Sequence, residues 1–122
     1  MTDYHPSVYI AGPMRFHPDL NEPEFRRAAA HAASIGWEPV VPKDIPPIDH
    51  AGDCPTGYHS GHEGHSGWCY LRADVAVMAA CDAVLMLHGW ETSKGATAEY
   101  QIAALLRLPI YGEIKPLPVV SE

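Results

Sequence analysis

Residues 82–104 read DAVLMLHGWETSKGATAEYQIAA, and this stretch carries the clearest structural pattern in the chain. An uninterrupted apolar run at 83–87 predicts a buried strand. Glycine and serine residues then break the pattern, and apolar spacings of three, four and seven residues predict a helix after them. Glu99 falls on the apolar side of that helix, in line with Ile102 and Leu106. A buried carboxylate is costly unless something uses it, so Glu99 is the first candidate for chemistry.

The rest of the chain continues this alternation of strand and helix, and its 122 residues fit a single domain over 1–122. The pattern predicts an α/β fold: a flavodoxin-like (Rossmann-like), doubly wound parallel sheet of four to five strands with right-handed crossovers. Asp82, between a helix and a strand, is predicted to be structural. In chain order we expect a strand at Ser7–Ala11, a helix over 21–36, a strand at Trp37–Val41, a helix at Tyr70–Ala80, the strand and helix described above, and a strand at Leu108–Tyr111.

An irregular insert at about 44–69 is rich in histidine, glycine and proline. Such long irregular segments in a compact domain are usually functional or mobile. The insert holds zinc ligand types, but their spacing matches no standard zinc finger. A flexible lid over the substrate is the favoured alternative, and no metal site is predicted. The zinc candidates that this leaves are Cys54, His59, His62, His65 and Cys69.

Composition and charge disfavour several classes of partner and location for this protein. The formal net charge is −7 and no basic run is present, which disfavours a nucleic acid polymer as partner. No apolar stretch is long enough to span a membrane, and no signal peptide is visible at the start of the sequence. Three cysteines are too few for a disulfide framework. We therefore expect a cytoplasmic protein with no membrane partner.

In a doubly wound sheet, ligands bind at the carboxyl ends of the strands, beside the point where the strand order reverses. The loops after the first and third strands should meet there, and Gly12 opens the first of them. Arg15, in the same loop, could hold a phosphate bidentately, and the helix-start amides around Gly95 could bind it as well. Ser93 could contact that phosphate or only cap the helix. Trp90 could stack on a nucleobase or simply plug the surface.

Two further residues could complete a site with Glu99. Asp74 shares a helical stripe with Leu71, so it would lie partly inside; the alternative is a surface acid beside Arg72. Tyr9 could be simple core, or its phenol could bind a buried carboxylate. Two carboxylates in one crevice are the pair that glycosidic chemistry requires, one attacking and one handling protons.

Three segments carry a family resemblance: YIAGPMR at 9–15, the stretch from Leu71 through Asp74 to Asp82, and SKGATAE at 93–99. On these segments the chain resembles the nucleoside 2-deoxyribosyltransferase superfamily. Within it, the chain is similar to small, often phage-borne deoxyribosyltransferase-like domains and to 2′-deoxynucleoside 5′-monophosphate N-hydrolases. The resemblance implies a flavodoxin-like fold, which agrees with the pattern above.

The resemblance also implies a role for each matched residue. Glu99 would be the nucleophile that attacks the sugar, and Asp74 would assist the leaving base. Tyr9 would orient the nucleophile, while Arg15 and Ser93 would contact the 5′-phosphate. The sequence departs from the hydrolases after the arginine, where it reads FHPD instead of a glycine-rich loop, and in the histidine-rich insert.

The expected function is hydrolysis of the N-glycosidic bond of a (deoxy)nucleoside 5′-monophosphate through a covalent glycosyl-glutamate intermediate. The alternatives are a nucleoside 2-deoxyribosyltransferase that exchanges bases and a non-catalytic nucleotide-binding module. The chemistry needs no cofactor, and the partner would be a small nucleotide or nucleoside. The resemblance further implies a homodimer or higher homo-oligomer, and allows a phage-encoded protein acting in the host cytoplasm.

Overall fold

The structure is a computed structural model that describes residues 4–14, 17–46, 59–62 and 65–120. Its centre is a four-stranded, all-parallel sheet in the order β2-β1-β5-β6. This confirms the predicted flavodoxin-like α/β fold. The strands are β1 (Ser7–Ala11), β2 (Glu38–Val40), β5 (Ala83–Met86) and β6 (Ile110–Tyr111).

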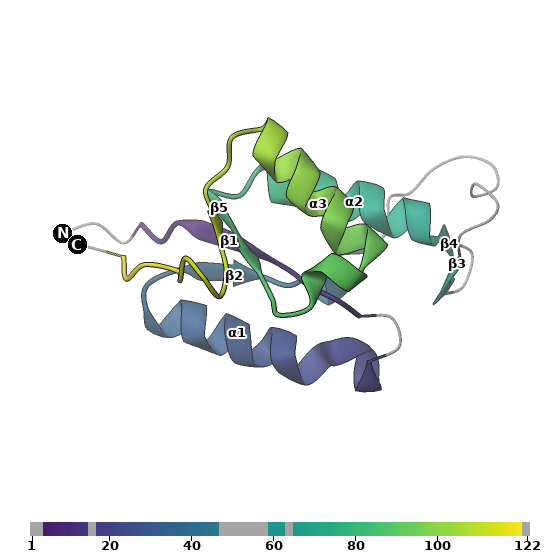
Figure 1. Ribbon diagram of the computed structural model, residues 1–122, viewed down its shortest axis with the longest axis horizontal. Coiled ribbons are helices and arrows are strands. Elements are labelled where there is room, and N and C mark those ends of the chain that lie inside the picture. The colour runs from purple at the N-terminus through teal and green to yellow at the C-terminus, as the bar shows by residue number, and fades with distance from the viewer. Residues whose placement is uncertain (1–3, 15–16, 47–58, 63–64, 121–122) are drawn as a thin grey trace.

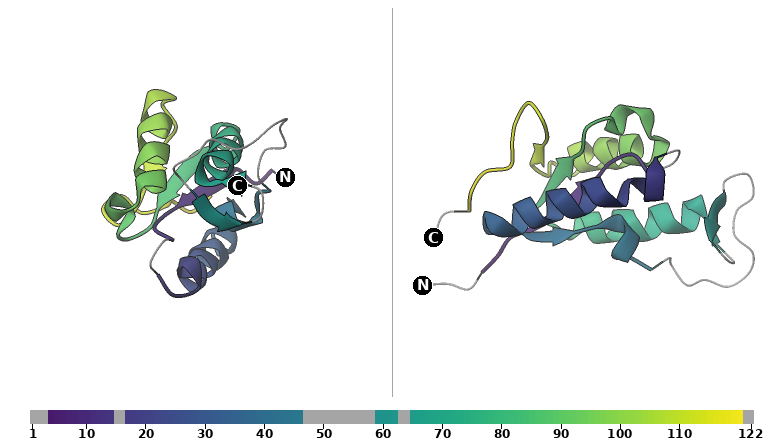
Figure 2. Two further views of the ribbon diagram at one scale, coloured as in Figure 1. Left: turned by 90° about the vertical axis from the view of Figure 1, so that its right-hand side faces the viewer. Right: turned by 90° about the horizontal axis from the view of Figure 1, so that it is seen from below.

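Helices cover both faces of this sheet. Helix α1 (Glu22–Ser34) packs on one face, and α2 (Gly67–Ala79) and α3 (Lys94–Leu105) pack on the other (Figure 1 and Figure 2). Strand β2 lies on one side of β1 and β5 lies on the other. The chain therefore adds strands in one direction first and in the opposite direction afterwards, and the strand order reverses between β1 and β5. None of the described helices is long and apolar enough to cross a membrane.

Strand β1 supplies the core on both faces because successive side chains of a strand point in opposite directions. Val8 and Ile10 pack toward α1. Tyr9 and Ala11 pack toward α2 and α3, and all four residues are fully buried. Tyr9 is therefore fixed in the middle of the sheet with its ring in the layer that carries Asp74 and Glu99.

The irregular insert is shorter than the sequence predicts. Strands β3 (His59–His62) and β4 (His65–Ser66) form an antiparallel hairpin, and α2 begins at Gly67 instead of Tyr70. The prediction of irregular chain as far as residue 69 is therefore wrong for this part. A hairpin of so few residues has no apolar periodicity to reveal it, because its pairing is held by backbone hydrogen bonds. Residues 47–58 lie outside the described part of the chain.

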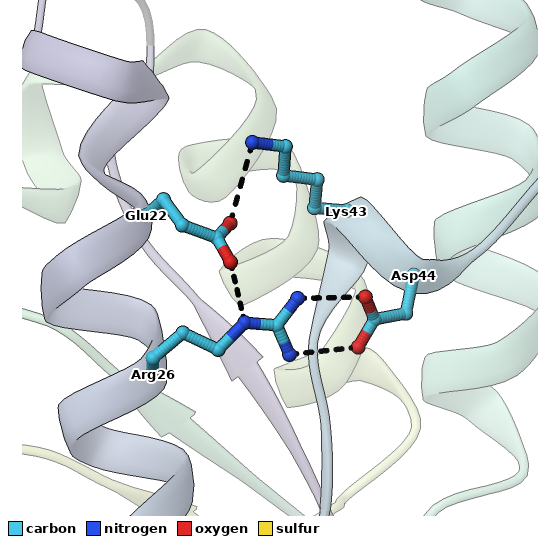
Figure 3. Close-up of polar contacts among 4 residues, drawn as sticks. All are labelled: Glu22, Arg26, Lys43 and Asp44. Atoms are coloured by element: carbon cyan, nitrogen blue, oxygen red, sulfur yellow. Dashed lines mark hydrogen bonds and ion pairs between the residues drawn. The ribbon is translucent and has the colours of Figure 1, made fainter.

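A charged cluster ties α1 to the chain that leaves β2 (Figure 3). Arg26 donates two hydrogen bonds to the Asp44 carboxylate, at 2.9 Å and 2.7 Å, and a third to Glu22. Lys43 Nζ lies 3.5 Å from the other oxygen of Glu22. The Arg26 guanidinium holds the pKa of Asp44 below its ordinary value. Because a bidentate arginine fixes direction as well as distance, the cluster orients the 3₁₀ turn Pro42–Asp44 against α1.

Candidate active site

The site centres on Glu99, which lies in the second turn of α3 with 5% of its surface exposed. Tyr9 reaches it from β1, and the phenolic hydroxyl of Tyr9 donates a hydrogen bond to Oε2 of Glu99. Burial raises the pKa of Glu99 to about 7, although the hydrogen bond from Tyr9 opposes this shift. Glu99 is therefore buried, as its helical spacing predicts, and it is poised to ionise near neutral pH.

Asp74 faces the same region from α2. The residue is half-buried, and its Oδ1 atom is fully buried without a hydrogen-bond partner among the described residues. Burial, together with the negative charge of Glu99, raises the pKa of Asp74 to about 8. Burial and the charges of both carboxylates hold the pKa of Tyr9 well above its usual value, so Tyr9 remains a donor.

These three residues form a coupled group with distinct protonation states. Glu99 ionises before Asp74, because Tyr9 donates a hydrogen bond to Glu99. Near neutral pH, the two carboxyl groups can thus hold one proton between them, and one carboxylate with one carboxylic acid is the pairing that nucleophilic and acid catalysis need together. The buried Oδ1 of Asp74, which no described residue contacts by a hydrogen bond, is a group that a bound ligand would satisfy.

The loops that follow β1 and β5 meet at the carboxyl edge of the sheet, as predicted. The amide of Leu87 donates to the carbonyl of Ala11 at 2.8 Å. A Cβ atom on Gly12 would lie 2.8 Å from Cβ of Leu87, which is too close for any side chain at position 12. A Cβ on Gly89 would lie 3.6 Å from the Pro13 ring. Close packing of the two loops is thus enough to explain the glycine at position 12, and a role in binding stays a prediction.

Ser93 caps α3, which is the simpler of its two predicted roles. Its Oγ accepts a hydrogen bond from the amide of Ala96 at 3.1 Å, and its carbonyl accepts from the amide of Thr97 at 2.9 Å. Gly95 lies in the first turn, where a Cβ atom would meet only Ser93 Oγ, at 3.9 Å. Packing therefore does not explain this glycine. Ser93 already accepts from the amides of Ala96 and Thr97, so at the helix start the amides of Lys94 and Gly95 are the ones left without an acceptor among the described residues.

Trp90 contacts the protein on more than one side. Its ring stacks on Tyr100 of α3, with centroids 4.7 Å apart and an interplanar angle of 19°. It also packs against the core cluster that contains Tyr9 and Ala96. The plugging role is the one that these contacts support, and stacking on a nucleobase stays a prediction. Sequence reasoning missed Tyr100, because nothing in the local pattern pairs it with a ring ten positions earlier.

The remaining predicted residues divide between described and undescribed parts of the chain. Arg15 and Cys54 lie outside the described residues, and of His59, His62 and His65 the backbone alone is described, in β3 and β4. Cys69 is fully buried at the start of α2.

Asp82 has the structural role predicted for it. Its Oδ2 accepts hydrogen bonds from the amide of Ser7 at 2.8 Å and from the hydroxyl of Tyr4 at 3.0 Å. These bonds join the beginnings of β1 and β5, at the amino edge of the sheet, opposite the edge where the two loops meet.

The same architecture occurs in solved structures. One is described as a "2-desoxiribosyltransferase from Leishmania mexicana" and is 22% identical, with a TM-score of 0.59 over 88% of this chain and 63% of that one. Another, a conserved protein from Enterococcus faecalis V583, is 16% identical, with a TM-score of 0.59 over 89% of this chain and 63% of that one. This chain thus spans less than two thirds of either protein, and the likeness is one of fold. A search of curated proteins found no match. The family model described as "Domain of unknown function (DUF4406)" matches residues 6–111, and the chain belongs to that family.

Proposed function

We propose that the protein cleaves the N-glycosidic bond of a (deoxy)nucleoside 5′-monophosphate by forming a covalent bond between the sugar and Glu99. The observation that carries the proposal is the Tyr9–Glu99 hydrogen bond, together with the buried Oδ1 of Asp74, which has no hydrogen-bond partner in the described part of the chain. The fold supports it, since a protein described as a 2-desoxiribosyltransferase has the same architecture.

In the first step, Glu99 attacks the anomeric carbon of the sugar. Because Tyr9 holds Oε2, we assign the attack to Oε1 of Glu99. The bond between the anomeric carbon and the base nitrogen breaks, and its electron pair leaves with the base. Asp74 donates its proton to that base, which avoids an anionic leaving group. The positive charge that develops on the sugar is stabilised by the Glu99 carboxylate beside it.

In the second step, water attacks the same carbon and releases Glu99. Asp74, now a carboxylate, takes the proton of that water, so both carboxyl groups return to their starting states. The products are the free base and the sugar 5-phosphate. If a second base attacks in place of water, the reaction is a deoxyribosyl transfer. The shared architecture with the Leishmania mexicana 2-desoxiribosyltransferase makes this the leading alternative.

We assign the 5′-phosphate to the start of α3. Helix N-termini bind phosphate through unpaired amides and the positive end of the helix dipole. The amides of Lys94 and Gly95 have no acceptor among the described residues, whereas the amide of Ala96 is bonded to Ser93. Ser93, as the cap, lies beside them. The resemblance adds Arg15 as a second phosphate ligand. The proposed chemistry requires no metal or organic cofactor.

A substrate panel tests the proposal. The protein is incubated with nucleosides and their 5′-monophosphates, and free base is followed by chromatography. We expect Glu99→Gln to lower base release by roughly a thousandfold or more, because the amide cannot act as the nucleophile. Asp82→Asn is the matched control, since it removes a carboxylate at the opposite edge of the sheet.

The outcomes separate the alternatives. Intact-protein mass spectrometry during turnover should show a sugar phosphate attached to the wild type and absent from Glu99→Gln. Base release that survives in Glu99→Gln would contradict the nucleophile assignment. A second free base that becomes glycosylated identifies a transferase. Release from none of the substrates would favour the non-catalytic nucleotide-binding module.

A further inference from the structure

The stacked pair Trp90–Tyr100 connects the loop after β5 to helix α3. The two rings are nearly parallel, with their centroids 4.7 Å apart. Trp90 is half-buried, because it also packs against the core around Tyr9, whereas 37% of Tyr100 is exposed. The indole of Trp90 is thus held between the core and one ring of α3. Removing the Tyr100 ring would release it on one side.

The position of Trp90 determines the position of the turn that follows it. The amide of Trp90 donates to the carbonyl of Leu87 at 3.2 Å, and the amide of Ser93 donates to the carbonyl of Trp90 at 3.0 Å. Thr92 adds two bonds to the carbonyl of Gly89, from its amide at 3.1 Å and from its hydroxyl at 2.7 Å. The turn from Gly89 to Ser93 is therefore one closely hydrogen-bonded unit, so a movement of Trp90 would move Ser93 with it.

Ser93 is also the cap of α3, so this unit ends where the helix begins. We propose that Tyr100 is a positioning residue for phosphate: by stacking on Trp90, it holds the Gly89–Ser93 turn where the start of α3 can bind a 5′-phosphate. The proposal rests on the function proposed above. Tyr100 itself touches neither the sugar nor the phosphate in this scheme; it acts through Trp90 and Ser93.

The competing role for the pair is a platform for the base. Both substrates of the assay, a nucleoside and its 5′-monophosphate, carry the same base. If the pair is a base platform, removing the stack should therefore weaken the binding of both substrates equally. If Tyr100 positions the phosphate site, removing the stack should weaken the binding of the monophosphate alone. The ratio of the two kcat/KM values consequently distinguishes the two roles.

The experiment measures kcat and KM for both substrates in the wild type, Tyr100→Ala and Tyr100→Phe. We expect Tyr100→Ala to raise KM for the monophosphate roughly five- to tenfold, with a smaller change in kcat, as the loss of one aromatic pair implies. Its KM for the nucleoside should match the wild type. Tyr100→Phe keeps the ring and should restore the wild-type ratio. Leu105→Ala is the control, since Leu105 is 82% exposed on the same helix.

An equal decrease of kcat/KM with both substrates in Tyr100→Ala would overturn the inference. If Tyr100→Ala fails to fold, Tyr100→Leu replaces it in the comparison with Tyr100→Phe, because leucine keeps apolar volume without a planar face. A wild type that treats the two substrates alike overturns the phosphate assignment and this inference with it. A wild-type preference for the monophosphate that persists in the ring-deleted variant overturns this inference alone and leaves the proposed function standing.

Discussion

Tyr9 and Glu99 lie 90 positions apart in the sequence, and inside the core the hydroxyl of Tyr9 donates a hydrogen bond to Oε2 of Glu99. This bond favours the ionised form of Glu99 against burial, which favours the neutral form. Asp74 Oδ1 has no described donor, and its carboxyl group also faces the charge of Glu99. The order of ionisation in the site, Glu99 before Asp74, follows from this difference.

The first prediction concerns the pH dependence of base release. The reaction needs Glu99 ionised and Asp74 protonated, and their pKa values are about 7 and about 8. We expect a narrow bell-shaped profile of kcat/KM, whose two limbs report the apparent values of the coupled pair. Asp74→Asn should lower the rate and abolish the alkaline limb. Initial rates across the neutral range test this, and an alkaline limb that persists in Asp74→Asn contradicts the assignment.

A second prediction concerns Tyr9→Phe, which removes the donor to Glu99 and leaves the ring in place. The pKa of Glu99 should rise, because the hydrogen bond that lowers it is lost. The acid limb of the profile should therefore move to higher pH. The unpaired Oε2 should also destabilise the fold by about 1–3 kcal/mol at a pH where Glu99 is ionised. Tyr4→Phe is the matched control, since it removes only the exposed bond to Asp82.

Stability should also depend on pH through Glu99. Its pKa is raised from 4.5 to about 7, so the folded protein holds this proton more tightly than the unfolded chain does. The contribution of Glu99 to the free energy of unfolding is complete below about pH 4.5 and is lost as pH rises to about 7, by on the order of 3 kcal/mol. Glu99→Gln should flatten this slope.

Urea unfolding at acidic and mildly alkaline pH measures that slope. Glu91→Gln is the control, because it neutralises an exposed glutamate in the loop before α3. A slope that Glu99→Gln leaves unchanged would mean that Glu99 does not retain its proton in the folded state.

A fourth prediction tests the contact between the two loops. A Cβ at position 12 would lie 2.8 Å from Cβ of Leu87, 3.0 Å from its Cδ1 and 3.1 Å from its Cγ. Gly12→Ala should therefore lower the free energy of unfolding by about 1–3 kcal/mol. Part of that loss should disappear in the Leu87→Ala background, because alanine at position 87 removes Cγ and Cδ1 and keeps only Cβ. A double-mutant cycle in urea measures the coupling, and strictly additive losses would contradict the packing explanation.

Gly95→Ala provides the opposite case. A Cβ at position 95 would meet only Ser93 Oγ, at 3.9 Å, so the fold has room for it. Alanine inside a helix should stabilise the protein by about 0.5–1 kcal/mol relative to glycine. The same methyl group should cover the amides assigned to phosphate, so KM for the monophosphate should rise while KM for the nucleoside stays unchanged. Unchanged KM values for both substrates would show that the phosphate binds elsewhere.

Much of this architecture could be predicted from local pattern. Strand β1 has the predicted bounds, Ser7–Ala11, because a short run rich in β-preferring residues ends at a glycine and a proline. Helical spacing predicts the burial of Glu99, but Leu106, which the same spacing puts on the buried side, follows the end of α3 and is 51% exposed. The hairpin β3–β4 could not be predicted, because its pairing leaves no apolar periodicity. Helix α2 begins earlier than expected for a related reason: its first residues, from Gly67, lie inside the stretch that composition marks as irregular.

The sequence by itself indicated which residues share a face, and so it placed Glu99 on the inner side of its helix, while it left Asp74 either partly inside or at the surface. Side-chain direction within one helix or strand depends on local spacing, which sequence displays directly. The tertiary structure alone decided that Tyr9 reaches Glu99, that Asp74 Oδ1 is left without a described partner, and that Trp90 is covered by Tyr100. These relationships depend on how strands and helices distant in the sequence pack together, because a hydrogen bond or a ring stack forms only when its two partners are brought within a few ångströms.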